Sequence, residues 1–203
     1  MAIGVPAMAA PSFYGYTGLV TIPTADALDE GQYSIGAFAL DVEEGVDSNV
    51  YAANLGLAEA LELGFARLKT EGAPGETIIS AKYRFFQETA KHPAIAAGVI
   101  DFTDEIDSTS YIVASKSIRW RGKTSFGEIT APRVHIGAAG GQIDGLFAGL
   151  SAAFGNRLLL MAEYDSQDVN FGARLAISDA LRIHAALLDA DNLGLGISFS
   201  KVF

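Results

Sequence analysis

The 203-residue sequence predicts an all-β protein, a transmembrane antiparallel up-and-down β-barrel of about 12 strands. Short segments of alternating apolar and polar residues recur along the whole chain. The chain is 50% hydrophobic and only 19% charged, with a mean hydropathy of +0.27, yet it has no run of the ~18 apolar residues that a membrane helix needs. The charges also divide between alternate loops, which suggests two ends in different surroundings.

The alternation is clearest at residues 169–175, 181–185 and 193–199. A period of two places the two sets of side chains on opposite faces of a strand. Marking every such run predicts strands at 33–41, 49–57, 61–69, 77–86, 94–103, 109–118, 133–140, 145–154, 158–165, 168–176, 180–188 and 193–203. Most approach the ~9–11 residues that a tilted strand needs to cross a bilayer. In 33–41 and 94–103 neither face is clearly polar.

A soluble lipocalin-like barrel or a sandwich would alternate in the same way, but with its apolar residues inward. Here the polar face is poor in Lys and Glu and rich in Gly, Ala, Ser and Asn, which suits a lumen better than a water-exposed wall. Aromatic residues lie near strand ends, as in an interfacial girdle: Tyr33, Phe85, Phe86, Tyr111, Phe154, Tyr164 and Phe199. We therefore favour the membrane barrel.

More than half of the 24 acidic residues fall in every second connection, where there is no Lys or Arg. In a meander these connections share one end of the barrel, so we expect an acidic outer rim. Its carboxylates are hard oxygen ligands suited to bridging divalent cations to lipopolysaccharide, although charged loop tips are usually only solvated. We expect cation contact at Glu43, Glu44, Asp47, Asp104, Glu105 and Asp107.

The face predicted to line the lumen also carries ionisable and amide side chains. These are Lys82, Arg84, His135, Glu163, Asn170, Arg174, Arg182 and His184. They would form either an internal salt-bridge network, because unpaired buried charge is costly, or a polar lining that selects a solute. In the first case we expect Arg174 to pair with Glu163.

The N-terminal region differs from the rest of the chain. Residues 1–10 contain a small-x-small pattern at Ala7–Ala9, so they are either a signal-peptide remnant or a disordered Ala-rich tail. Residues 11–32 form a segment that would lie in the periplasm or plug the lumen. Residues 33–203 would form the outer-membrane barrel.

Three segments carry a resemblance to a known family. They are G-L-V-T-I-P-T-A-D-A-L-x-x-G-Q-Y-S-I-G at residues 18–36, N-L-G-L-A-E-A-L-E-L-G-F at 54–65 and A-E-Y-D-S-Q-D-V-N-F-G-A-R-L at 162–175. They resemble YjbH-like outer-membrane β-barrel proteins, which are associated with exopolysaccharide, in a short single-barrel version. The alternating C-terminal strand ending in Phe203 likewise resembles the terminal signal of bacterial outer-membrane barrels.

The resemblance implies a bacterial outer-membrane protein with a structural or pore role in the cell envelope, linked to exopolysaccharide export. The alternative is a partner-binding envelope scaffold with no open pore. The expected partners are outer-membrane lipid and lipopolysaccharide, with polysaccharide or other envelope proteins. The resemblance brings no catalytic residues.

The composition also excludes several classes of function. The chain has no Cys, which excludes thiol catalysis and Cys-ligated zinc, and its net charge of −10 without a basic cluster argues against nucleic acid. No serine-enzyme signature accompanies its 3 histidines. We therefore expect no enzyme, no cofactor and no resident metal.

Overall fold

The computed structural model describes residues 9–43, 46–120, 122–124, 127–155 and 157–203. These residues form thirteen strands: β1 (Gln32–Glu43), β2 (Val46–Ala58), β3 (Leu61–Thr70), β4 (Glu76–Phe86), β5 (Ala94–Ile100), β6 (Thr109–Ser117), β7 (Gly122–Thr124), β8 (Gly127–Gly140), β9 (Gly145–Phe154), β10 (Leu158–Tyr164), β11 (Val169–Ala176), β12 (Leu181–Leu188) and β13 (Asn192–Val202). In the described part of the chain, no helix is long and apolar enough to cross a membrane.

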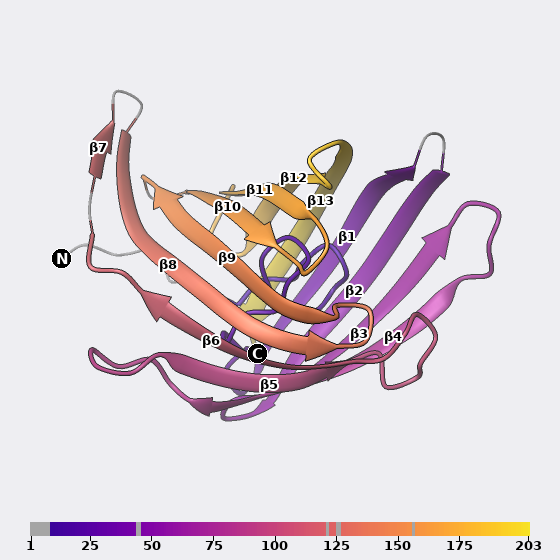
Figure 1. The fold of residues 1–203 in the computed structure, drawn as a ribbon, viewed down its shortest axis with the longest axis horizontal. Coiled ribbons are helices and arrows are strands. Elements are labelled where there is room, and N and C mark those ends of the chain that lie inside the picture. The colour runs from indigo at the N-terminus through magenta and orange to yellow at the C-terminus, as the bar shows by residue number, and fades with distance from the viewer. Residues whose placement is uncertain (1–8, 44–45, 121, 125–126, 156) are drawn as a thin grey trace.

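Twelve of the strands close into a barrel (Figure 1). Strands β1 to β6 pair in sequence order, β8 to β13 do the same, β1 pairs with β13, and β6 pairs with β8. All these pairs are antiparallel, and closure leaves no long unpaired edge. The predicted 12-stranded antiparallel barrel is confirmed.

Two ends of the barrel follow from this meander. The connections that follow β1, β3, β5, β8, β10 and β12 share one end, which we call the acidic end. The connections that follow β2, β4, β6, β9 and β11 share the other, which we call the turn end. The C-terminus lies on the turn-end side beside the start of β1, where the amide of Phe203 donates to the carbonyl of Gly31 at 2.9 Å.

One predicted boundary differs by a full hairpin. The predicted strands 109–118 and 133–140 leave residues 119–132 as a connection, but β7 and the first part of β8 extend beyond the barrel as a short antiparallel arm. The pairing of β8 with β9 shifts register between Thr130 and Arg133, around Pro132, and Ala131 has a φ of +47°. A bulge is one of the few places where a sheet accepts a proline, and such an interruption hides the strand from an alternation search.

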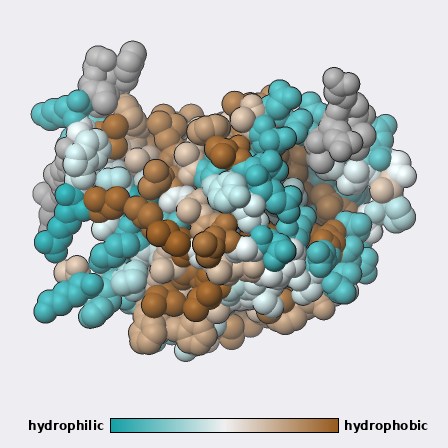
Figure 2. Space-filling model, viewed as in Figure 1, coloured by the Kyte–Doolittle hydropathy of each residue, from teal (hydrophilic) through white to brown (hydrophobic). Residues whose placement is uncertain are grey.

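The outer wall of the barrel is apolar. Every barrel strand except β5 carries at least one exposed large apolar side chain, such as Ile35, Phe65 or Leu195, each about half exposed. On the face shown in Figure 2, hydrophobic residues spread across the middle and lower part of the molecule, and many of the hydrophilic residues lie toward its left and right sides. Tyr111, expected in the aromatic girdle, instead points into the lumen and is buried.

Residues 9–31, which we call the plug, lie inside the ring of strands (Figure 1). Phe13, Val20 and Ile22 of the plug are fully buried and form part of the central apolar cluster. Phe13 packs on Phe38 of β1 with ring centroids 5.2 Å apart. This contact explains why strand 33–41 shows no polar face, because one of its faces lies on the outer wall and the other meets the plug.

A tight turn joins β12 to β13. Asp189 and Ala190 both have positive φ values, 52° and 54°, and the amide of Asp191 donates to the carbonyl of Leu188 at 3.1 Å. This is the type I′ geometry that hairpins favour, but alanine is strained in it by about 1 kcal/mol. We expect Ala190→Gly to raise stability by about 0.5–1 kcal/mol in thermal unfolding followed by gel mobility.

The matched control is Ala148→Gly on the outer face of β9, which has no positive φ to relieve. There glycine only adds freedom to the unfolded chain and should cost about 0.5–1 kcal/mol. Equal effects of the two substitutions would contradict the turn assignment.

Candidate functional site

The lumen is the candidate site, and the plug occupies it. Within itself the plug makes two isolated bridges, Pro11 with Thr17 and Gly18 with Pro23, and a few further main-chain hydrogen bonds, such as that from the Phe13 amide to the Val20 carbonyl at 2.9 Å. Buried backbone N–H and C=O groups still require hydrogen-bond partners. Charged and amide side chains of the barrel wall supply many of them, with carboxylates binding N–H groups and cations binding carbonyls.

Glu163 of β10 binds one turn of the plug. Its carboxylate accepts hydrogen bonds from the amides of Val20 (2.9 Å), Thr21 (2.5 Å) and Ile22 (3.3 Å) and from the Thr21 hydroxyl (2.6 Å). Asn170 of β11 donates to the same carboxylate at 3.3 Å. Residues 20–22 thus form a small nest of donors around a buried anion.

A second pair of side chains binds the plug from β3 and β4. Glu62 and Lys82 are directly opposite each other in the strand register, and both are buried. Glu62 accepts from the amide of Leu28 at 2.9 Å and from the Thr17 hydroxyl at 2.5 Å. The Lys82 ammonium donates to the carbonyls of Thr17 (2.6 Å) and Asp26 (3.0 Å).

Arg174 of β11 binds the plug through three of its main-chain carbonyls. One of its guanidinium nitrogens lies 3.2 Å from the carbonyl oxygens of Pro11 and Gly18 and 3.3 Å from that of Leu19. Its Nε lies 3.2 Å from Nδ1 of His184, whose other nitrogen binds the Ser198 hydroxyl at 2.7 Å. The expected Arg174–Glu163 ion pair is not formed, because each side chain binds the plug backbone.

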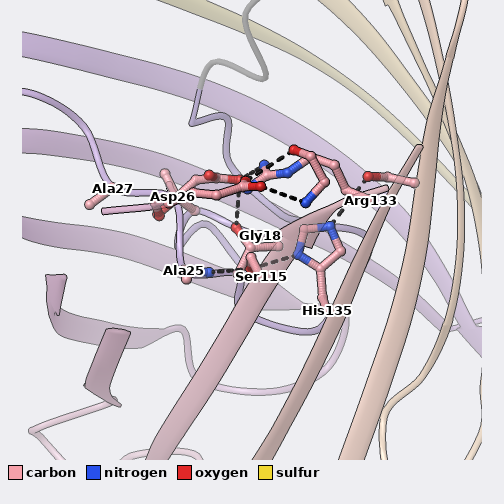
Figure 3. A network of polar contacts seen from close by, with 12 residues as sticks. Gly18, Ala25, Asp26, Ala27, Ser115, Arg133 and His135 are labelled. Atoms are coloured by element: carbon pink, nitrogen blue, oxygen red, sulfur yellow. Dashed lines mark hydrogen bonds and ion pairs between the residues drawn. The ribbon is translucent and has the colours of Figure 1, made fainter. Parts of the chain in front are cut away.

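A fourth contact joins the plug to β6 and β8 (Figure 3). Arg133 forms an ion pair with Asp26 of the plug at 2.6 Å. The amide of Ala25 donates to the Ser115 hydroxyl at 2.9 Å, and Ser115 in turn lies 2.8 Å from Nδ1 of His135. The other nitrogen of His135 lies 3.3 Å from the Ser151 hydroxyl.

The structure places all eight predicted lumen residues on the inward face. Lys82, His135, Glu163, Asn170, Arg174, Arg182 and His184 are buried, and Arg84 is partly buried beside Asp29 at 3.5 Å. Two central residues were missed, Glu62 and Arg133. Both signals were present in the sequence: Glu62 alternates with the apolar, outward-facing residues of 61–69, and Arg133 lies two residues before His135 on the same face of the predicted strand 133–140.

The predicted acidic rim lies at the acidic end. Asp47, Asp104, Glu105 and Asp107 are exposed there, whereas Glu44 and the side chain of Glu43 lie outside the described part of the structure. Within the described ranges, no group of three or more His, Asp or Glu side chains could hold a metal ion. The expected signal-peptide remnant or tail at 1–10 falls mostly on residues 1–8, which are also outside the described ranges.

At the turn end, Glu88 links three elements. It accepts hydrogen bonds from the amide (2.8 Å) and hydroxyl (3.0 Å) of Ser117 and lies 3.4 Å from Lys116 and 3.5 Å from Arg133. Burial alone would raise the pKa of Glu88, but the Ser117 hydrogen bonds and the neighbouring Arg133 and Lys116 hold this pKa below its usual value. A depressed folded-state pKa stabilises the fold above the ordinary carboxyl pKa and loses that effect as the pH falls through the folded value.

We therefore expect acidification to loosen the 87–93 turn, and Glu88→Gln to remove this part of the pH dependence. To test this pH dependence, melting temperatures of the wild-type protein and of Glu88→Gln are measured from neutral pH down to about pH 3. This range spans the ordinary carboxyl pKa. The two curves should differ at neutral pH and converge in acid. Parallel curves over the whole range would contradict the role given to Glu88.

The chain resembles the crystal structure of the outer membrane protein Omp33 of Acinetobacter baumannii, with 11% identity and a TM-score of 0.46 over 86% of this chain and 99% of that one. It also resembles a low-pH structure of OprB of Pseudomonas putida, with 9% identity and a TM-score of 0.28 over 85% and 91%. At these scores the fold assignment rests on the strand pairing described above.

No curated protein matches the sequence significantly. A family model does match, over residues 10–203, which include the plug as well as every strand. Its description is "Exopolysaccharide biosynthesis protein YbjH". The chain therefore belongs to the YjbH family of exopolysaccharide biosynthesis proteins.

Proposed function

We propose that the protein is a bacterial outer-membrane barrel that serves exopolysaccharide production as a closed component of the envelope. The observation that carries this proposal is the occupied lumen. Glu62, Lys82, Glu163 and Arg174 are all buried, and each binds main-chain groups of the plug. These are the groups that would line the passage of an open pore.

The outer-membrane location is supported by the wall of the barrel. Soluble monomers rarely expose an apolar surface that runs around the whole molecule. A closed sheet is also one of only two structures that satisfy their backbone hydrogen bonds in lipid. The family's description supports the link to exopolysaccharide.

The orientation proposed here places the turn end in the periplasm and the acidic end outside. An even number of strands brings the start of β1 and the end of β13 to the turn end, and the acidic connections then lie together at the opposite, extracellular end. The acidic end would then face lipopolysaccharide, with divalent cations between the carboxylates and the lipid phosphates. A lower melting temperature in EDTA, measured with lipopolysaccharide present, would support this contact, and an unchanged one would count against it.

A transport role is the second candidate, and one feature favours it. Beyond its short backbone links to strand ends, the plug joins no sheet, so it could be displaced without breaking a pairing between barrel strands. Displacement would expose a lumen lined by charged side chains, as in selective channels. We propose no enzymatic step and no cofactor.

Conductance across a planar bilayer separates the two candidates. A closed component should give no discrete current steps when the purified wild-type barrel is inserted. Stable steps from the wild-type protein would overturn the closed state and favour transport. Recovery of the protein in a non-membrane fraction of the cell would overturn the proposed location.

A further inference from the structure

A cavity of about 360 Å³ lies at the turn end, between the plug and the inner wall of the barrel. Its volume falls within the range of about 300–1,000 Å³ that is usual for ligand sites. The cavity belongs to the same end as the chain terminus, away from the acidic loops. It is separate from the contacts of Glu163 and Glu62 with the plug.

The cavity is rich in arginine. Its lining contains five arginines against two carboxylates: Arg84, Arg133, Arg157, Arg174, Arg182, Asp26 and Glu88. The lining therefore carries an excess of three positive charges in a chain whose net charge is −10. In the proposed orientation this positive region faces the periplasm, and the acidic end would repel the same anionic ligand.

The two carboxylates of the lining do not neutralise its five arginines, although Arg84 also lies 3.5 Å from Asp29 outside the lining. Both pair with a single arginine, Arg133, at 2.6 Å from Asp26 and 3.5 Å from Glu88. Arg174 donates to main-chain carbonyls and to His184, which are neutral acceptors. The Arg133 side chain is only 9% exposed, and its Nε is buried without a hydrogen-bond partner in the described structure.

We propose that this cavity binds a carboxylate-bearing sugar unit of an acidic polysaccharide. Guanidinium groups bind carboxylates through two parallel hydrogen bonds, and an arginine cluster is therefore suited to a uronate. Gln87, Ser117 and Ser151 also line the cavity and supply neutral donors and acceptors suited to sugar hydroxyls. The identification as a polysaccharide rests on the proposed function, whereas the anionic character of the ligand rests on the arginines.

Arg157 gives the cleanest test. It is exposed at the edge of the cavity, and its side chain makes no hydrogen bond or ion pair within the described residues, so its replacement should leave the fold intact. Arg119 is the matched control, because it is an exposed arginine at the same end that does not line the cavity. The probe is trigalacturonate, titrated into the detergent-solubilised full chain, with maltotriose and inorganic phosphate as comparisons.

Trigalacturonate should bind, maltotriose should not, and affinity should fall as salt rises. Arg157→Gln should weaken binding by about three- to fivefold, the effect of an exposed charge pair, and Arg157→Glu by more. Arg119→Gln should leave binding unchanged. Absence of trigalacturonate binding, equal binding of maltotriose, or equal loss in both arginine variants would overturn the proposal.

Competition by phosphate at the same concentration as trigalacturonate would identify a general anion site, such as one for a lipid headgroup, and would also overturn the sugar assignment. These outcomes are distinct from a failure of the proposed function. A strain that lacks the protein but secretes normal exopolysaccharide would overturn the function while leaving the binding result as measured. If exopolysaccharide secretion depends on the protein but the protein does not bind trigalacturonate, the uronate site is overturned and the proposed function stands.

Discussion

Glu163→Ala should release the plug from the lumen while leaving the strand pairing of the barrel intact. The substitution removes the acceptor for three main-chain amides, which are left buried without a partner, and leaves the Thr21 hydroxyl only its second acceptor, Asp165 at 3.1 Å. Breaking a buried charged contact on one side typically costs about 3–5 kcal/mol. We expect a fall of that size in the free energy of unfolding, together with faster proteolysis within residues 9–31.

Two further variants show whether the charge contact is responsible. Glu163→Gln keeps one acceptor oxygen but turns an NH2 donor toward one of the plug amides. Its free energy of unfolding should therefore lie between those of the wild-type protein and Glu163→Ala. Glu59→Ala is the matched control, because Glu59 is an exposed acid in the β2–β3 turn. If Glu163→Ala and Glu59→Ala melted alike and resisted protease alike, the nest of amides would not hold the plug.

Gly56→Ala should also disrupt the plug, at the point where it leaves the lumen. A Cβ at Gly56 of β2 would lie 2.0 Å from the carbonyl oxygen of Asp29 and 3.0 Å from that of Leu28. These atoms are main-chain atoms and cannot rotate away, and the amide of Gly31 donates to the carbonyl of Gly56 at 3.0 Å. Overpacking of this kind costs about 3 kcal/mol, measured as a loss of thermal stability.

Gly140→Ala provides the comparison at the end of β8. Gly140 has no atom within 4 Å of the position of a Cβ, and its φ is not positive. The substitution should change stability by no more than about 0.5 kcal/mol. A loss at Gly140 as large as the loss at Gly56 would show that strand glycines matter through the backbone and not through contact with the plug.

The sequence predicts the strands of this barrel closely because period-two alternation is a direct consequence of strand geometry. Strand 181–188 alternates from Leu181 to Ala185 without interruption, and the structure matches it within one residue. The prediction is weaker where the alternation disappears. In β1, both Ile35 on the outer wall and Phe38 against the plug are apolar, so neither face of this strand is polar.

The alternation along each strand assigns these side chains to the lumen, but it does not predict their hydrogen-bond partners. Arg174 and Glu163 lie on sequentially neighbouring strands, so pairing between them was the natural expectation. The actual partners lie more than 140 residues away in sequence, in a segment without periodicity. Such contacts depend on the three-dimensional path of the plug, and no local pattern in residues 9–31 encodes that path.

The position of Ala25 tests the occupied lumen most directly. Ala25 of the plug is fully buried, and its amide donates to the Ser115 hydroxyl of β6. Because the sequence contains no cysteine, a single Ala25→Cys variant can be labelled at that position alone. In the folded protein, Cys at position 25 should resist a water-soluble maleimide, whereas Ala73→Cys in the exposed β3–β4 loop should react quickly. Both should react fully after unfolding. Labelling at position 25 as fast as at position 73 in the folded barrel would contradict a lumen closed by its own N-terminal segment.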